Sequence, residues 1–201
     1  TSWKEFWAAA QGPASGRTMV HDYQLTAIGN ALKSFGYSFN SLDPKELADA
    51  EKLLIEVKPH LFAINSDIQP SMRSGDAWLA MSWTGDASQL HRDNAQMQFE
   101  LGKEGGELWS DFFAIPKNSE HKDAAYAFIN YLLDPQHNKL EVLSHGYPSG
   151  DKRVDALLPT AMLSDPIMYP AAEALSPLEF GAAATLTSPA RAELMARFKS
   201  A

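Results

Sequence analysis

The sequence contains no cysteine, so it has no disulfide framework, no thiolate metal site and no cysteine nucleophile. Its longest apolar runs are a few residues, far short of the ~20 that a membrane-spanning helix needs, and we expect no direct membrane insertion. Cationic side chains are scarce, because 17 Lys and Arg stand against 25 Asp and Glu, a formal net charge of −8. This balance, with no basic cluster, argues against nucleic acid as a partner and favours a cationic one.

Motifs for cofactors and catalysis are also missing. No G-x-G-x-x-G fingerprint occurs, residues 102–106 lack the spacing of a phosphate loop, and residues 146–150 are one position off a nucleophile elbow. The six histidines are scattered without a metal-ligand pair, so we predict surface or structural roles for them, no metal and no cofactor. The chain begins at Thr1 with no Met and no signal-peptide pattern, which we interpret as the start of a mature or truncated product.

Strand-like and helix-like patterns alternate along the chain, which is typical of the α/β class. The length of 201 residues fits one large domain or two small ones. Short apolar runs predict strands, and apolar residues spaced three and four apart between capping signals predict helices. The predicted strands are 18–20, 62–64, 77–83, 98–101 and 108–115, and the main predicted helices are 3–10, 24–35, 44–58, 68–73, 85–95, 122–133, 135–144 and a final one starting at Pro189.

Aromatic residues lie next to carboxylates at the ends of two predicted strands. Trp109 and Asp111 are two residues apart, so on a strand they would project from the same face, where an unpaired charge is costly. Trp83 and Asp86 form a second pair, although Trp83 could belong to the core and Asp86 could cap a helix. An indole ring beside a carboxylate suits an alkylammonium ion, because the ring packs the methylenes and attracts the cation while the carboxylate accepts charged hydrogen bonds.

A series of short motifs follows in a fixed order along nearly all of the chain. They are Asn40-Ser41 with Asp43–Leu47, Asn65–Asp67, Ser74–Asp76, Trp83–Asp86, Gly102–Gly106, Asp111 with Ala114–Pro116, Ala125–Pro135 and Gly146–Pro148. In this order they resemble the spermidine/putrescine-binding proteins, which are the periplasmic solute-binding components of polyamine ABC importers. The resemblance corresponds to the C-terminal two-thirds of such a protein.

The resemblance implies a type II periplasmic binding protein fold, in which two α/β lobes close on a ligand and each lobe has a mixed sheet flanked by helices. In that family, aromatic rings sandwich the aliphatic chain of the ligand and carboxylates hold its amines. Carried over motif by motif, this implies ligand-binding roles for Trp83, Asp86, Trp109, Asp111 and Tyr147.

Two further positions depart from the family pattern. The family usually has an Asp-x-x-Glu pair after its first strand, and here Tyr23 and Thr26 fall at those positions, with Asp22 one place earlier. We include Tyr23 and Thr26 among the candidate ligand-binding residues. Losing two carboxylates should weaken the binding of a tri- or tetra-amine, so a diamine, a monoamine or another cationic metabolite fits as well as spermidine. The family's glutamine near the end of the chain also has no match around Gly181.

The resemblance also predicts how the chain divides. Residues 1–109 and 157–201 would form the second lobe, and residues 110–156 would be an excursion that belongs to the first lobe, the rest of which precedes this chain in the family. Without that lobe's sheet, the inward face of helix 122–133 would expose apolar surface, which favours association or disorder.

The leading hypothesis is therefore a non-catalytic periplasmic protein that captures a small cationic amine and delivers it to the membrane permease of an ABC importer. One alternative is a hydrolase-type enzyme with a Ser/His/Asp site drawn from Ser110, Ser149, His145 and Asp111. Another is a lobe that kept the fold, lost the ligand and recognises a partner. The geometry of the cleft distinguishes these alternatives, since a hydrolase needs a serine–histidine hydrogen bond there and a ligand-free lobe would bury both tryptophans.

Overall fold

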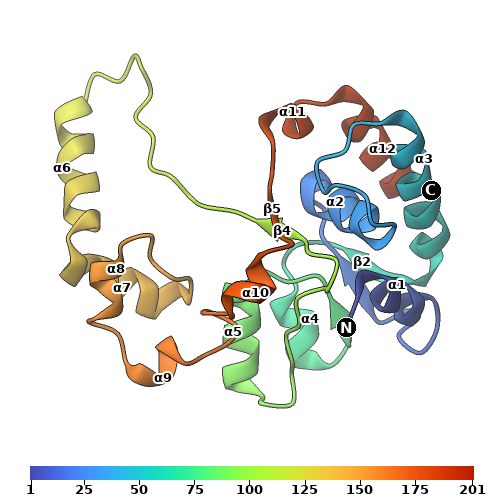
Figure 1. Cartoon of the computed structure of the whole chain (residues 1–201), viewed down its shortest axis with the longest axis horizontal. Helices are drawn as coiled ribbons and strands as arrows, with labels where there is room; N and C mark the ends of the chain where they lie inside the picture. The colour runs from blue at the N-terminus through green and yellow to red at the C-terminus, as the bar shows by residue number, and fades with distance from the viewer.

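Three short parallel strands lie at the centre of an α/β body in the computed structural model, which describes residues 1–201 (Figure 1). β1 (Thr18–Val20) is the middle strand and is buried throughout. β2 (Leu61–Ile64) and β3 (Leu79–Ala80) pair with it on either side in parallel. All three therefore end at the same edge of the sheet.

The two faces of this sheet are covered by different sets of helices. Val20 belongs to a cluster of 15 buried residues together with residues of α1, α2, α3 and α12. Its neighbour Met19 points to the opposite face and packs with Ile68, Ala77 and Leu90. The helices and turns of this body are α1 (Trp3–Gln11), α2 (Gln24–Ser34), α3 (Pro44–Val57), η1 (Lys58–His60), α4 (Gln69–Ser74), α5 (Thr84–Asp93), α11 (Ala183–Leu186) and α12 (Pro189–Ser200).

Local capping chemistry explains where several helices begin. The Asp43 carboxylate accepts hydrogen bonds from the backbone N–H groups of Lys45 and Glu46, and Pro44 takes the first helical position of α3. Ser188 caps α12 in the same way, with a proline following it. These starts agree with the sequence prediction.

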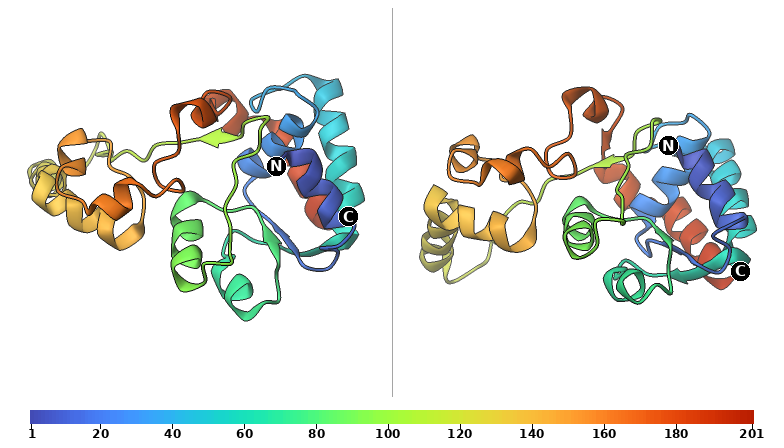
Figure 2. Two further views of the ribbon diagram at one scale, coloured as in Figure 1. Left: turned by 60° about the horizontal axis from the view of Figure 1, so that its bottom comes forward. Right: turned by 90° about the horizontal axis from the view of Figure 1, so that it is seen from below.

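The chain leaves the body after β4 (Glu107–Leu108) and forms what we call the arm, residues 109–169. The arm contains α6 (Lys122–Leu133), α7 (Pro135–His145), α8 (Lys152–Asp155) and α9 (Thr160–Leu163), which extend away from the sheet (Figures 1 and 2). Its own cluster holds only four buried residues, one of them Met168. The chain returns through α10 (Ala172–Leu175) to β5 (Glu179–Phe180), which pairs in parallel with β4.

The α/β class and the predicted helices are confirmed, but three expectations about strands are wrong. Every strand pair is parallel, so neither sheet is mixed, because each strand is joined to the next by a helical crossover. Residues 98–101 form no strand. The predicted strand 108–115 ends at Leu108, because nothing beyond that point lies beside it to complete a ladder, and Phe112 is 86% exposed. None of the helices combines the length and apolarity needed to cross a membrane.

Candidate functional site

A cavity of about 290 Å³ lies where the chain continues beyond the carboxyl ends of β1 and β3. This is the edge at which open α/β sheets bind ligands. Trp83 follows β3 and Trp109 follows β4, and both indole rings line the cavity and are only half-buried. The rings therefore face the cavity and are not packed into the core.

His21, the residue after β1, also lines this cavity. Its ring centroid lies 4.4 Å from that of Trp83, and neither of its ring nitrogens has a hydrogen-bond partner. Burial lowers the pKa of His21 to about 4, against the opposing influence of the Asp22 and Asp86 carboxylates. The imidazole is therefore neutral at pH 7. No sequence signal connects His21 with the site, because its spacing matches no ligand motif.

Glu107 supplies a carboxylate that is not among the residues predicted from the sequence. It lines the cavity, is half-buried, and accepts a hydrogen bond from the hydroxyl of Thr26, a buried residue in the first turn of α2. Burial raises the pKa of Glu107, and the hydrogen bond from Thr26 offsets only part of this effect. Glu107 stands two residues before Trp109, which is the same spacing that drew attention to Asp111.

Of the two positions that depart from the family pattern, Thr26 lines the cavity and Tyr23 does not. Tyr23 is 39% exposed at the start of α2. Partial burial raises the pKa of its hydroxyl, and the negative charge of Glu107 raises it further. Asp22 is exposed and accepts a hydrogen bond from Ser66.

Tyr147, Asp86 and Asp111 form a second group beside the cavity, whose lining does not include them. The Tyr147 ring lies so close to Gly85 that a Cβ atom there would be 2.4 Å from it. Burial raises the pKa of Tyr147 to about 12, and the charges of Asp86 and Asp111 contribute in the same direction. Trp109 connects this group to the cavity, because its ring meets that of Tyr147 edge-on with centroids 5.1 Å apart.

The two predicted aspartates are held differently. Asp86 is in the first turn of α5 but does not cap it, since the cap residue is Trp83 and the Asp86 carboxylate accepts a hydrogen bond from the Gln69 side chain. Asp111 is exposed in the irregular start of the arm. The expectation that Asp111 and Trp109 share one face of a strand is wrong, because the strand ends at Leu108.

The residues considered for a hydrolase site do not form a catalytic pair. The Ser149 hydroxyl donates a hydrogen bond to Asn138 over 2.6 Å. The Nδ1 atom of His145 accepts from the backbone N–H of Tyr147 at 3.0 Å. Neither Ser110 nor Ser149 is hydrogen-bonded to His145. This arrangement lacks the activated nucleophile that acyl transfer requires.

The chain is similar in sequence to known bacterial solute-binding proteins. The family model of the bacterial extracellular solute-binding proteins matches residues 1–169. The spermidine/putrescine-binding periplasmic protein of Escherichia coli (strain K12) is 33% identical over 177 residues, which are 87% of this chain and 50% of that protein. The spermidine/putrescine-binding periplasmic protein 1 of Haemophilus influenzae is 28% identical over 176 residues, 87% of this chain and 48% of that protein. The chain thus spans about half the length of the curated relatives it matches.

The chain is also similar in fold to solved structures. A spermidine/putrescine ABC transporter substrate-binding protein from Streptococcus pneumoniae, crystallised with calcium and HEPES, superposes with a TM-score of 0.80 at 28% identity, covering 99% of this chain and 61% of that one. The Tp0655 lipoprotein of Treponema pallidum superposes with a TM-score of 0.76 at 23% identity, covering 99% of this chain and 60% of that one. The predicted fold is therefore confirmed.

Proposed function

The chain belongs to the family of bacterial extracellular solute-binding proteins, and from that premise we propose that it carries the binding site for a polyamine or a related cationic amine. The observation that carries the proposal is that Trp83 and Trp109 both present half-exposed rings to a cavity that also contains the Glu107 carboxylate. Aromatic faces attract a cation with about 0.5–2 kcal/mol per ring and pack its methylene chain at the same time.

The charge of the cavity favours a cation over an anion. No lysine or arginine side chain lines it, whereas the carboxylates of Glu100 and Glu107 do. Asp86 and Asp111 add two more negative charges around Tyr147. The protein as a whole also has a formal net charge of −8, which would attract a cationic ligand over longer distances.

The amine would be delivered to the membrane permease of an ABC importer, in the periplasm. The relatives support this setting, since they are named as periplasmic binding proteins for spermidine and putrescine. Residues 1–109 and 157–201 would form one lobe and residues 110–156 would contribute to a second lobe. The separation of α6 and α7 from the central sheet supports that division (Figure 1). The role is transport, without catalysis.

Isothermal titration calorimetry tests the proposal. Putrescine and spermidine are titrated into the protein, with 1,4-butanediol as the control because it has the same four-carbon chain as putrescine and no charge. We expect binding heat for at least one amine and none for the diol. An absence of binding for every amine, or equal binding of the diol, would contradict the proposal.

The variant Asp111→Ala sharpens the test. Removing this carboxylate leaves an ammonium group of the ligand without its partner, so we expect putrescine affinity to fall by about tenfold or more. The matched control is Asp123→Ala, which removes the same charge from an exposed position on α6. If both variants bind putrescine as tightly as the unmodified protein, Asp111 has no role in binding.

A further inference from the structure

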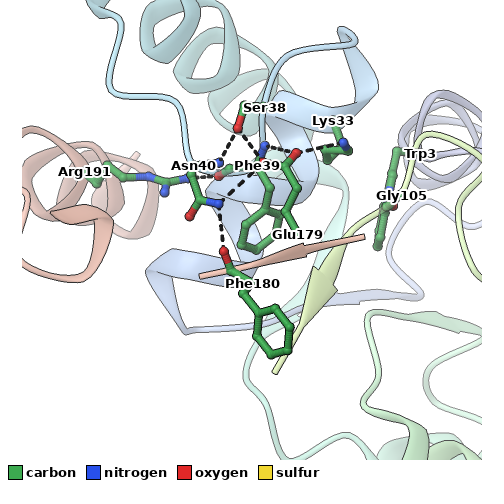
Figure 3. Close-up of polar contacts among 9 residues, drawn as sticks. All are labelled: Trp3, Lys33, Ser38, Phe39, Asn40, Gly105, Glu179, Phe180 and Arg191. Carbon is green, nitrogen blue, oxygen red and sulfur yellow. Dashed lines mark hydrogen bonds and ion pairs between the residues drawn. The ribbon is translucent and has the colours of Figure 1, made fainter. Parts of the chain in front are cut away.

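Two glutamates occupy equivalent positions in the small sheet, and their surroundings differ. Glu107 of β4 and Glu179 of β5 are directly paired in register. Glu179 accepts hydrogen bonds from the Ser38 hydroxyl, from the backbone N–H of Phe39 at 2.9 Å and from the Lys33 ammonium group at 2.9 Å (Figure 3). Burial opposes ionisation of Glu179, but these donors outweigh it and hold its pKa at about 2. Glu179 is thus satisfied within the protein and ties β5 to α2.

Glu107 has no such set of partners. Its one hydrogen bond comes from the neutral hydroxyl of Thr26, and it takes part in none of the ion pairs of the protein. His21, which also lines the cavity, is neutral at pH 7 and supplies no positive charge. A half-buried carboxylate without a cation is costly, and the raised pKa of Glu107 reflects this cost. The carboxylate lines the cavity, so a cation in the cavity could reach it.

We propose that Glu107, oriented by Thr26, binds an ammonium group of the ligand other than the one that the family resemblance assigns to Asp86 and Asp111. This inference rests on the proposed function and specifies its ligand as an amine with at least two ammonium groups. Trp109 links the two groups, because its ring lines the cavity with Glu107 and also meets the ring of Tyr147, whose pKa the charges of Asp86 and Asp111 both raise. The site therefore has two anionic ends joined by aromatic walls. A flexible diamine has the matching pattern of two cations joined by methylenes.

The position of Thr26 supports an orienting role. Its side chain is buried in the first turn of α2, where the helix backbone holds it rigidly, and its hydroxyl donates to one Glu107 oxygen. The second oxygen of the carboxylate is left for a ligand. A carboxylate fixed in this way loses less side-chain entropy on binding than a freely rotating one.

The test compares two variants from the same segment of chain. Glu107→Gln removes the charge and keeps an oxygen that can accept from Thr26, so folding is expected to be preserved. Glu104→Gln removes the same charge three residues away, from a side chain that contacts the backbone N–H of Trp3 and does not line the cavity. Calorimetry with putrescine and with butylamine, which has one ammonium group, measures the affinity of each protein for a diamine and for a monoamine.

We expect Glu107→Gln to lower putrescine affinity by about tenfold or more and to bring the ratio of diamine to monoamine affinity close to one. Glu104→Gln should leave both unchanged. A loss of folding or of packing alone would weaken both ligands alike and would leave the ratio unchanged, which contradicts the inference. Equal putrescine affinity in both variants, with binding intact in the unmodified protein, overturns the role of Glu107 and leaves the proposed function standing. If the unmodified protein binds no amine, the role of Glu107 and the proposed function are both wrong.

Discussion

The body and the arm contain helices of similar length and regularity, yet they bury their side chains very differently. α2 in the body buries nine of its 11 residues. α6 in the arm has 12 residues and buries none of them, although its sequence has the apolar spacing of an amphipathic helix. Tyr126, Phe128 and Tyr131 are each more than half exposed. The spacing of apolar residues thus predicts a helix and its apolar face, but it does not show whether a packing partner is present.

The largest expected effect tests this difference in packing. Leu54→Ala removes a side chain from α3 that is 0% exposed, and should lower the free energy of unfolding by about 4 kcal/mol. Leu140→Ala makes the same change on α7 of the arm, where the side chain is 60% exposed, and should cost less than about 1 kcal/mol. Urea unfolding followed by far-UV circular dichroism reports on both regions. Equal losses would show that the arm is packed as tightly as the body.

A somewhat smaller effect is expected from His21, where the body meets the cavity. Burial lowers its pKa to about 4 from the ordinary value of 6.5, despite the opposing carboxylates of Asp22 and Asp86. The unfolded chain therefore binds a proton at a higher pH than the folded protein does. Stability should fall as the pH drops through this window, by about 3 kcal/mol between pH 7 and pH 4 from this group.

The variant His21→Gln isolates this contribution. Its free energy of unfolding should decline less between pH 7 and pH 4 than that of the unmodified protein, because other titrating groups are common to both. Urea titrations at the two pH values measure the difference. Parallel declines in the two proteins would mean that His21 titrates normally in the folded state.

The smallest expected effect concerns the contact between the two regions. Gly85→Ala places a methyl group where the Tyr147 ring now lies, so the ring must move away from α5 and disturb its contact with Trp109. We expect putrescine affinity to fall by about tenfold, which is about 1.4 kcal/mol. The free energy of unfolding should change little, because the gain from a better helix former opposes the cost of displacing the ring. Gly150→Ala is the control, because an added Cβ there would meet no atom within 4 Å beyond its own chain neighbours. Unchanged affinity in Gly85→Ala would show that the site does not depend on Tyr147.

Much of this architecture could be predicted from the sequence because its signals are local. The Asp43-Pro44 start of α3 and the bounds of α6 follow from capping and spacing within one helix. Local signals could not show that the predicted strand 108–115 is absent, because a strand requires a neighbouring strand to pair with, and the segment around the exposed Phe112 has none. The contact of Tyr147 with Gly85 joins residues 62 positions apart in the sequence, and no local pattern encodes it.

The candidate site likewise contains residues that could be predicted from the sequence and one that could not. Trp83 and Trp109 could be recognised as cavity rings from their places after strands. Glu107 could not be recognised from the sequence, because a polar side chain there is typical of an exposed residue unless the strand is known to begin at this position. Its significance comes from what is absent around it, namely a cation, and that can be seen only in three dimensions.

A crystal structure of the protein with putrescine tests whether the aromatic rings and carboxylates at the edge of the sheet bind a cationic amine. We expect the methylene chain to lie against Trp83 and Trp109, with one ammonium group within hydrogen-bond distance of Glu107 and the other within that distance of Asp86 or Asp111. Putrescine bound elsewhere on the protein, or an empty cavity in crystals grown at saturating putrescine, would contradict the account.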